Sequence, residues 1–401
     1  MLAACGGSQP LIGAPGTLLP ASTSAGYRVL HNFGAAKSPD GQQPKAGLID
    51  LNGTLYGTTY VGGAHGFGTG LPGYGTVFSI TPDGSERVIY DFKGPKVGDG
   101  KNPAASLFAV NGVLYGTTEN GGTRANYGTV FSVSTSGMEK VLYRFQGYFY
   151  GQDGANPLAS LIDVDGKLYG TTLAGGTNDN GTVFRVTTTG EEKVLHSFFQ
   201  GYSDGGSPVA NLLNVKGTLY GTTEYGGQAC SCNGGGTIFS ITRTGTEKVL
   251  FAFNQYTNPE GSFPQVGLIH VKGLLYGTTP KDGAYTDGGT AFSITTTGSI
   301  SVLHTFSSGS GPDGSGPDAP LLNVKGTLYG TTEFGGDYGK GTVYKMSLTG
   351  SKEKVLHSFG YGSDGATPVA GLIDVNGTLY GTTSAGGTNG NGTVFALKLP
   401  R

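Results

Sequence analysis

The chain alternates short runs of apolar and β-branched residues with glycine-rich turns, and no segment has the spacing of an amphipathic helix. In the last full copy of this pattern, residues 369–375 and 378–383 are predicted strands joined by Asn376-Gly377, a strong two-residue hairpin signal. A glycine-rich segment leads to a third predicted strand at residues 393–397. Earlier copies add a fourth, such as residues 354–359. Each copy therefore predicts four antiparallel strands.

The pentapeptide Leu-Tyr-Gly-Thr-Thr marks seven copies of this unit, with tyrosines at Tyr56, Tyr115, Tyr169, Tyr220, Tyr276, Tyr329 and Tyr380. Four short strands cannot bury both faces of their own sheet, so the copies must pack face to face around an axis. A β-solenoid is the alternative, but its coils are usually shorter and its strands parallel. We predict an all-β, seven-bladed β-propeller over residues 26–401, with four antiparallel strands per blade.

The two ends of the repeat array predict how the ring closes. The last copy stops after its third strand, and residues 27–33, ahead of the first full copy, match the fourth strand of the others. We expect this N-terminal strand to complete the last blade, which removes an exposed sheet edge.

Composition agrees with a globular β protein and narrows its partners. The 76 glycines and the 13% of charged residues favour short strands and tight turns, and 22 Tyr with 20 Phe provide a core. The net charge is −2 with no basic run, so we expect no nucleic-acid partner. No run of eighteen apolar residues predicts a membrane-spanning helix in the chain as given.

The repeat unit, with Leu-Tyr-Gly-Thr-Thr, Gly-Thr-Val-Phe and Val-Leu-His-Ser-Phe, resembles the GloVer tandem repeat of choice-of-anchor bacterial surface proteins. The resemblance covers nearly the whole chain from residue 26. The fifth copy departs from it, because Pro280-Lys281-Asp282 replaces the Gly-Gly region and Ala291 replaces Val. The resemblance implies a cell-surface location. It brings no established activity and therefore no catalytic residues.

The first residues carry a second resemblance. Leu2-Ala3-Ala4-Cys5-Gly6 is similar to the lipobox of bacterial lipoproteins, although the basic and apolar segments that precede a lipobox are not in the sequence. The resemblance implies lipidation of Cys5 and an exported protein, either an outer-membrane or cell-surface lipoprotein or a secreted one. We therefore expect membrane contact only through a lipid anchor. Residues 1–25 are interpreted as this lipobox-like start and a flexible tether rich in Gly, Pro, Ser and Ala.

The loops after strands two and four of each copy vary in length, as ligand-binding loops on a rigid scaffold do. Three of the copies place a glutamate directly after Leu-Tyr-Gly-Thr-Thr, and several of these loops carry tyrosines. The candidate binding residues are Glu119, Glu224, Glu333, Tyr148, Tyr150, Tyr202, Tyr256 and Tyr361. Tyrosines could stack on sugar rings. Solvated glutamates, and tyrosines that shield the blade ends, are the structural alternatives.

Other polar groups have simpler interpretations. The repeated Asp-Gly-x-x-Pro is first of all a turn, and because no local calcium loop accompanies it, we predict no cofactor, with Ca²⁺ as a weak alternative. His31, His196, His304 and His357 alternate with Tyr or Phe in other copies, which favours a packing role, and no metal site is predicted. Cys230 and Cys232 are candidates for a local disulfide, a reduced pair or a soft-metal site.

Two functions remain open at this stage. The first is a non-catalytic binding module, expected to be a monomer, whose variable loops bind a polysaccharide or an envelope protein. The second is an extracellular polysaccharide lyase or glycoside hydrolase that uses carboxylates on the same face. We favour the binding module, because the sequence contains no nucleophile–base, metal-ligand or phosphate-loop motif. Two acidic groups that converge with an aromatic platform in one cleft would favour the enzyme.

Overall fold

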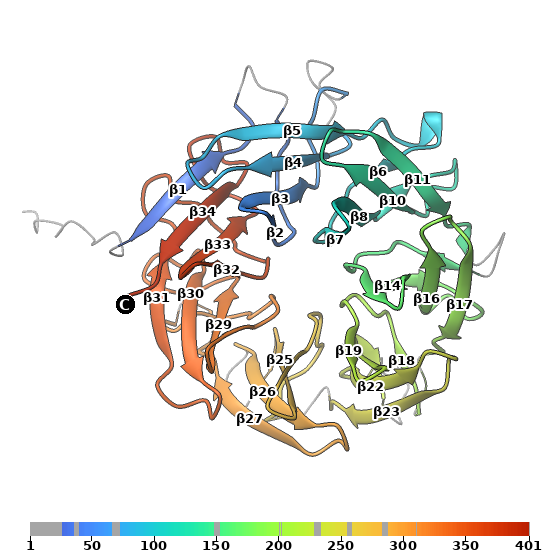
Figure 1. Cartoon of the computed structure of the whole chain (residues 1–401). Helices are drawn as coiled ribbons and strands as arrows, with labels where there is room; N and C mark the ends of the chain where they lie inside the picture. Colours follow the sequence, from blue (N-terminus) through green and yellow to red (C-terminus); the bar gives the residue numbers. More distant parts are fainter. Residues whose placement is uncertain are drawn as a thin grey trace, which may run out of the picture.

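The computed structural model describes residues 26–35, 40–65, 73–147, 153–199, 201, 203–227, 234–254, 259–282, 288–309 and 311–400. Seven four-stranded antiparallel sheets stand in a ring around a central axis (Figure 1). The predicted all-β, seven-bladed propeller is therefore confirmed. A 3-10 turn, η1 (Pro95–Val97), lies between blades 1 and 2, and no helix within the described residues is long and apolar enough to cross a bilayer.

Each blade begins with a three-residue strand nearest the axis and ends with an outer strand at the circumference. The first three blades are β2(Ile49–Leu51), β3(Thr54–Thr59), β4(Thr76–Ile80) and β5(Glu86–Asp91); β7(Phe108–Val110), β8(Val113–Thr118), β10(Thr129–Ser134) and β11(Glu139–Arg144); and β13(Ile162–Val164), β14(Lys167–Thr172), β16(Thr182–Thr187) and β17(Glu192–Ser197). Blades 4 and 5 are β19(Leu213–Val215), β20(Thr218–Thr223), β22(Thr237–Thr242) and β23(Glu247–Ala252); and β24(Ile269–Val271), β25(Leu274–Thr279), β26(Thr290–Thr295) and β27(Ile300–Thr305). Blade 6 is β28(Leu322–Val324), β29(Thr327–Thr332), β30(Thr342–Ser347) and β31(Lys354–Ser358), and blade 7 is β32(Ile373–Val375), β33(Thr378–Thr383), β34(Thr393–Lys398) and β1(Tyr27–Asn32).

Short two-stranded ladders brace the loops that enter blades 2, 3 and 4. They pair β6(Gly100–Lys101) with β9(Asn120–Gly121), β12(Gly154–Ala155) with β15(Ala174–Gly175), and β18(Gly205–Gly206) with β21(Tyr225–Gly226). Single antiparallel bridges do the same at the other blades: Gln42↔Val61, Ser262↔Lys281, Ser315↔Phe334 and Ala366↔Ala385. These pairings hold the loops after the second and fourth strands of each blade in a regular arrangement.

The ring closes as the sequence predicts. Strand β1 pairs antiparallel with β34, with Val29 opposite Phe395 and His31 opposite Val394, so the first described strand is the outer strand of the last blade. Figure 1 shows the two ends of the propeller side by side. This pairing covers the edge of β34 that would otherwise be exposed.

The predicted hairpin turns are also confirmed. Asn376 and Gly377 both have positive φ, at 55° and 80°, as a tight two-residue hairpin turn requires. The innermost strand is shorter than predicted, because β32 begins at Ile373 and not at residue 369. Residues just before it bond to the neighbouring blade instead: the Thr331 hydroxyl donates to the carbonyl oxygen of Ala370.

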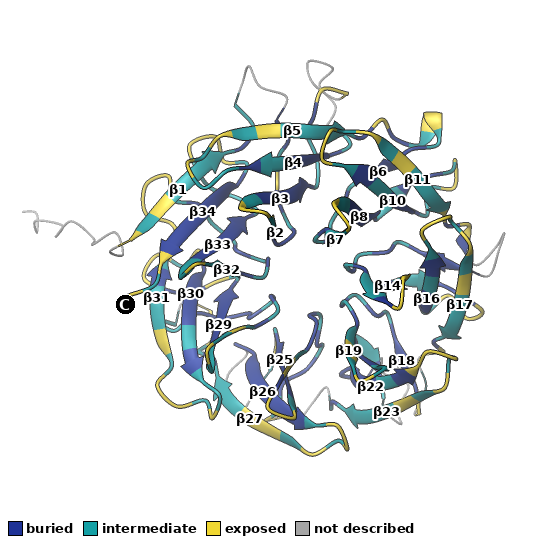
Figure 2. Ribbon diagram, viewed as in Figure 1, coloured by how far each residue is buried: buried dark blue, intermediate teal, exposed yellow. Residues whose placement is uncertain are grey.

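Seven clusters of buried side chains fill the spaces between neighbouring blades in the described structure. Figure 2 shows this burial along the middle strands of the blades. Between blades 7 and 1, Phe33 packs edge to face on Phe78 with ring centroids 5.1 Å apart. The motif glycine Gly57 lies against the same ring, since an added Cβ would stand 2.7 Å from it. Burying one Phe side chain fully stabilises the folded state by about 1.5–3 kcal/mol. The Phe33–Phe78 pair therefore contributes substantially to the stability of this interface.

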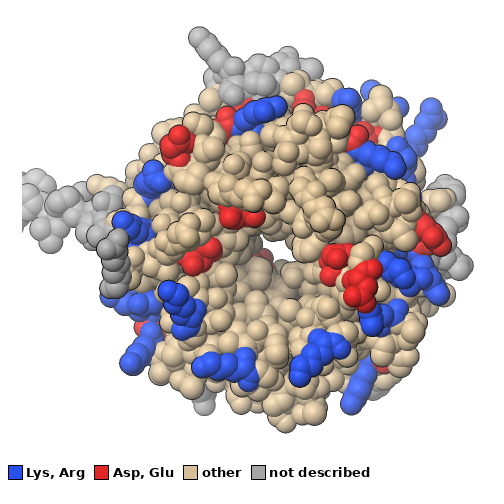
Figure 3. Space-filling model, in the orientation of Figure 1, with Lys and Arg blue, Asp and Glu red and all other residues tan. Residues whose placement is uncertain are grey.

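The axis of the propeller is open. The space-filling view shows a central opening, with acidic side chains close to it and most Lys and Arg side chains nearer the circumference (Figure 3). This distribution disfavours a polyanionic ligand along the axis of the face shown.

Candidate functional site

A basin of about 410 Å³ lies around the axis where the innermost strands begin. All seven blades contribute to it, each with residues that follow the proline of Asp-Gly-x-x-Pro or its equivalent. Its lining is Lys45, Ala46, Gly47, Ala104, Ala105, Ser106, Leu158, Ala159, Ser160, Leu173, Val209, Ala210, Asn211, Glu224, Gln265, Val266, Gly267, Asp318, Pro320, Val369, Ala370 and Gly371. Most of these side chains are small, so the few charged and amide groups define its chemistry.

Backbone and threonine hydrogen bonds place Glu224 at this basin. The Glu224 N–H donates to the carbonyl of Ser207 at 3.2 Å, which ties the end of β20 to the loop entering its blade. Two residues earlier, the Thr222 hydroxyl donates to the carbonyl of Val266 in blade 5 at 3.2 Å. Glu224 therefore stands at the junction of blades 4 and 5. Its Oε1 accepts a hydrogen bond from Gln265 Nε2 at 3.0 Å.

Asp318 is the second acidic group of the basin. Burial, together with the neighbouring carboxylates Glu333 and Glu224, raises the pKa of Asp318 to about 7, while Lys281 opposes the shift. Burial also raises the pKa of Glu333. Two of the three predicted glutamates therefore lie within electrostatic range of Asp318. The basin offers carboxyl groups that can accept hydrogen bonds and, at Asp318, donate a proton near neutral pH.

Glu119 has a different environment from the other two glutamates. The Tyr60 hydroxyl donates to Glu119 Oε2 at 2.8 Å, and Lys45 Nζ lies 3.7 Å from the centroid of the Tyr60 ring. Burial and the Glu119 carboxylate both raise the pKa of Tyr60 above its ordinary value. Glu119 is thus held by blade 1 and does not line the basin as Glu224 does.

Asp318 is a residue that the sequence analysis missed. It directly follows Pro317, the loop proline that recurs in every copy of the repeat. At this position the other copies have Lys45, Ala104, Leu158, Val209, Gln265 and Val369. An acidic residue confined to some of the copies is the signal that singled out Glu119, Glu224 and Glu333. Applied to every repeat position, it would have found Asp318.

Exposed aromatic residues gather on the loops of blades 6 and 7. Phe334 follows Glu333 directly and is 48% exposed. Tyr338, in the same loop, is 36% exposed, and its ring centroid lies 5.7 Å from that of the predicted Tyr361, which is 46% exposed. The sequence analysis missed Phe334 and Tyr338. The other predicted tyrosines Tyr148, Tyr150, Tyr202 and Tyr256, like Cys5, Cys230 and Cys232, lie outside the described residues.

The Asp-Gly-x-x-Pro aspartates act as turn residues. Asp40 is 2% exposed and its Oδ1 accepts the Gly34 N–H at 3.1 Å. Asp153 similarly accepts the Gly147 N–H at 2.7 Å. Each also contacts the aromatic or histidine side chain of the preceding outer strand: Tyr143 donates to Asp153 at 2.6 Å, and His31 Nε2 lies 2.8 Å from Asp40.

A glutamate at the start of the next outer strand, or directly before it, completes an outer polar cluster at five of the blade interfaces. These are Glu86, Glu139, Glu192, Glu247 and Glu353, and in each the Oε1 atom is shielded from solvent without a hydrogen-bond partner among the described residues. At the interface of blades 6 and 7, Tyr27 replaces the glutamate and stacks on His357 with ring centroids 3.7 Å apart. Every outer strand therefore packs a planar ring at this position, while the polar groups around the ring differ between copies.

Comparison with known proteins identifies the repeat. The family described as the Gloeobacter/Verrucomicrobia repeat matches residues 6–149, 69–288 and 264–400. A search among curated proteins finds no match to the chain. The matched ranges cover the propeller and agree with the resemblance seen in the Leu-Tyr-Gly-Thr-Thr copies.

Proposed function

Because the chain belongs to the Gloeobacter/Verrucomicrobia repeat family and folds into a propeller with an acidic axial basin, we propose that it is a non-catalytic carbohydrate-binding module. The observation that carries this proposal is the pair Glu333 and Phe334. Glu333 acts electrostatically on Asp318 in the basin, and the next residue, Phe334, presents an exposed aromatic ring.

The chemistry of these groups matches that of a sugar. Carboxylate and amide oxygens, such as those of Glu224 and Gln265, accept hydrogen bonds from hydroxyl groups, and an exposed aromatic ring packs on the apolar face of a pyranose. Tyr338 and Tyr361 extend the aromatic surface across the loops of blades 6 and 7. A glycan that enters the basin at blade 6 would meet both kinds of contact.

An enzymatic function is the second candidate, and Asp318 is the observation that favours it. A carboxylic acid whose pKa is raised to about 7 can donate a proton to a glycosidic oxygen, and a second carboxylate nearby can complete the pair. However, no aromatic residue lines the basin itself within the described residues. The criterion for an enzyme, two acidic groups and an aromatic platform in one cleft, is only half met.

We further propose that the protein acts at the cell envelope. The lipobox-like Leu2–Gly6 supports this, since lipidation of Cys5 would tether the propeller through residues 6–25. Incorporation of labelled palmitate into the wild-type protein and not into Cys5→Ser, expressed with a leader in a bacterial host, tests it. An unlabelled wild-type protein would contradict the lipid anchor.

A glycan array combined with a polysaccharide-cleavage screen tests the binding function. We expect the wild type to bind a defined set of glycans without releasing reducing or unsaturated ends. The double variant Glu224→Ala/Asp318→Ala should lose binding at least about tenfold, because hydrogen bonds to charged groups contribute about 1.5–3 kcal/mol each. Glu191→Ala, an exposed glutamate on a turn after a third strand, is the matched control.

Each outcome separates the two functions. Cleavage products that disappear in the double variant would establish the enzyme instead of the module. Binding that survives in the double variant would place the ligand away from the basin, and no binding to any glycan would reject carbohydrate.

A further inference from the structure

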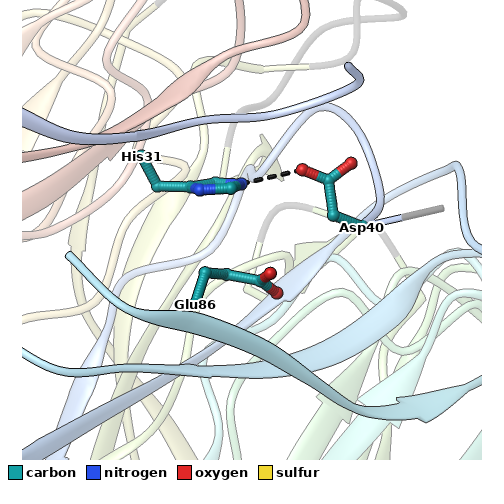
Figure 4. Close-up of side chains that lie close together, drawn as sticks. All are labelled: His31, Asp40 and Glu86. Atoms are coloured by element: carbon teal, nitrogen blue, oxygen red, sulfur yellow. Dashed lines mark hydrogen bonds and ion pairs between the residues drawn. The ribbon is translucent and has the colours of Figure 1, made fainter. Parts of the chain in front are cut away.

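Two of the outer polar clusters hold three side chains with the donor atoms of a metal site. His31, Asp40 and Glu86 meet between blades 7 and 1, and His196, Asp204 and Glu247 meet in the same way between blades 3 and 4. In each, one imidazole nitrogen and two carboxylate oxygens lie within 4.8 Å of one another. Figure 4 shows the imidazole of His31 directed at Asp40, with the carboxyl group of Glu86 beside them.

We propose that these two clusters are structural binding sites for a divalent transition-metal ion such as Zn²⁺. Imidazole nitrogen and carboxylate oxygen are both zinc ligands, with bonds of about 2.0–2.2 Å, so ligand atoms on a tetrahedral ion lie about 3.4 Å apart. The His31 and Asp40 atoms are 2.8 Å apart, and His196 Nε2 lies 3.3 Å from both oxygens of Asp204. Small side-chain movements would therefore close each site around an ion, with water as a fourth ligand.

The shielded glutamate oxygens support a bound cation. Oε1 of Glu86 and of Glu247 is inaccessible to solvent and has no hydrogen-bond partner among the described residues. No Lys or Arg forms an ion pair with either glutamate in the part of the chain that the structure describes. In each cluster a divalent ion would bind the imidazole and the two carboxyl groups in place of protons and would compensate the buried carboxylate charge.

The aspartates are already oriented as metal ligands usually are. Asp40 Oδ1 accepts the Gly34 N–H, which leaves Oδ2 for the ion. Asp204 accepts N–H groups from Phe199 at 3.1 Å and from Gly205 at 2.8 Å. Backbone hydrogen bonds of this kind fix the direction of a ligating carboxylate.

The other interfaces act as internal controls. In two of them a tyrosine hydroxyl takes the place of the imidazole and donates to the aspartate: Tyr90 to Asp99 and Tyr143 to Asp153. His304, Asp313 and Glu353 have the right residue types but do not form such a group. One extra residue, Lys352, enlarges the preceding turn, so Glu353 stands before β31, whereas Glu86 and Glu247 begin β5 and β23.

The proposed ions would fasten neighbouring blades together. His31 lies on β1, the strand that closes the ring, while Glu86 lies on the outer strand of blade 1. A bound ion would thus join the two ends of the ring. Sequence reasoning could not see this site, because its ligands are spread over two blades and no two of them have the short spacing of a metal motif.

Zinc binding to the untagged, chelator-treated full chain tests the proposal. A Cys5→Ser/Cys230→Ser/Cys232→Ser background removes all three thiols as competing ligands. We expect two zinc ions per chain by equilibrium dialysis with elemental analysis. At a zinc concentration 100 times the Kd, the apparent Tm should rise by about 3 °C per site.

His31→Tyr and His196→Tyr are chosen because tyrosine already occupies this position in other blades, which preserves folding. Each should reduce the stoichiometry from two to one, and the double variant should bind none. His304→Tyr is the matched control and should still bind two. The proposal is overturned if the wild type binds no stoichiometric zinc, or if His304→Tyr loses as much zinc as His31→Tyr.

Discussion

Thr382 in blade 7 donates its hydroxyl hydrogen to the carbonyl oxygen of Ala46 in blade 1, at 3.0 Å. The first threonine of every other Leu-Tyr-Gly-Thr-Thr makes the same bond to the next blade: Thr58 to Ala105, Thr117 to Ala159, Thr171 to Ala210, Thr222 to Val266, Thr278 to Ala319 and Thr331 to Ala370. These bonds form a ring at the rim of the basin. The repeat motif therefore both closes the propeller and shapes its candidate site.

Thr382→Val should destabilise the propeller by about 1–3 kcal/mol, because it keeps the side-chain shape and leaves a buried carbonyl without its donor. Thr382→Ser should recover most of this loss. Thr378→Val is the control, since Val113 and Leu274 already occupy that position in other blades. Urea unfolding measures all three. Equal free energies of unfolding for Thr382→Val and Thr378→Val would contradict the role of the bond.

Removing the hydroxyl group of Tyr344 should stabilise the folded protein. It is fully buried, its Oη has no hydrogen-bond partner among the described residues, and phenylalanine fills the corresponding position in all other blades, as at Phe78. Because an unpaired buried hydroxyl costs about 1–3 kcal/mol, Tyr344→Phe should raise the free energy of unfolding by about 1 kcal/mol. Calorimetry checks this. A lower Tm for Tyr344→Phe would show that the hydroxyl group has a partner.

Thr367 should also be replaceable with a gain in stability. Its φ is 58°, in the left-handed region where a β-branched residue is strained. Asn102 and Asn156 occupy the same position in blades 2 and 3, and Asn102 Nδ2 donates to the Tyr60 carbonyl at 3.0 Å. In thermal unfolding, Thr367→Asn is expected to raise the free energy of unfolding by about 1 kcal/mol, whereas Thr367→Val should leave it unchanged. A gain for valine as large as for asparagine would contradict the backbone explanation.

The outer polar clusters that contain tyrosine predict a pH dependence. Burial raises the pKa of Glu139 and Glu192 to about 7 in the folded protein, above the ordinary value of 4.5, and the nearby Asp99 and Asp153 add to the shift. Folding therefore favours the protonated form. The contribution of these groups to stability is complete below about pH 4.5 and is lost as the pH rises through about 7.

Glu139→Gln/Glu192→Gln mimics the protonated pair. Its Tm should exceed that of the wild type at pH 8 and match it at pH 4.5, with a gain of about 0.5 kcal/mol per site, because solvent reaches both groups and screens the effect. Glu191→Gln, on the exposed neighbour of Glu192, should change nothing at either pH. A difference between variant and wild type that does not grow with pH would contradict the assigned pKa shifts.

The fold followed from the sequence because the same local signals are repeated seven times. Each Leu-Tyr-Gly-Thr-Thr, each two-residue turn and each Gly-Thr-Val-Phe fixes a strand, and the missing fourth strand of the last copy identified β1 as its partner. The inner strand was predicted too long, since residues 369–372 look apolar but their contacts cross to another blade.

The candidate site was predicted only in part, because it arises where seven blades meet. Glu224 was identified by its position in the repeat, but nothing local relates it to Gln265, 41 residues away. Asp318 and Phe334 sit at positions that vary among copies: Phe334 directly follows Glu333, and Asp318 lies in the loop that enters the same blade. Side chains that converge through closure of a ring have no signature in spacing along the chain.

The most direct test of a glycan site beside the basin is calorimetric titration of an array-selected glycan into the wild type, Phe334→Ala and Phe199→Ala. Both phenylalanines are exposed, at 48% and 50%, but Phe199 follows the outer strand of blade 3. The proposed site predicts at least about tenfold weaker binding for Phe334→Ala, since loss of one aromatic stacking contact costs about 1.4 kcal/mol, and an unchanged Kd for Phe199→Ala. Equal affinities for wild type and Phe334→Ala would contradict it.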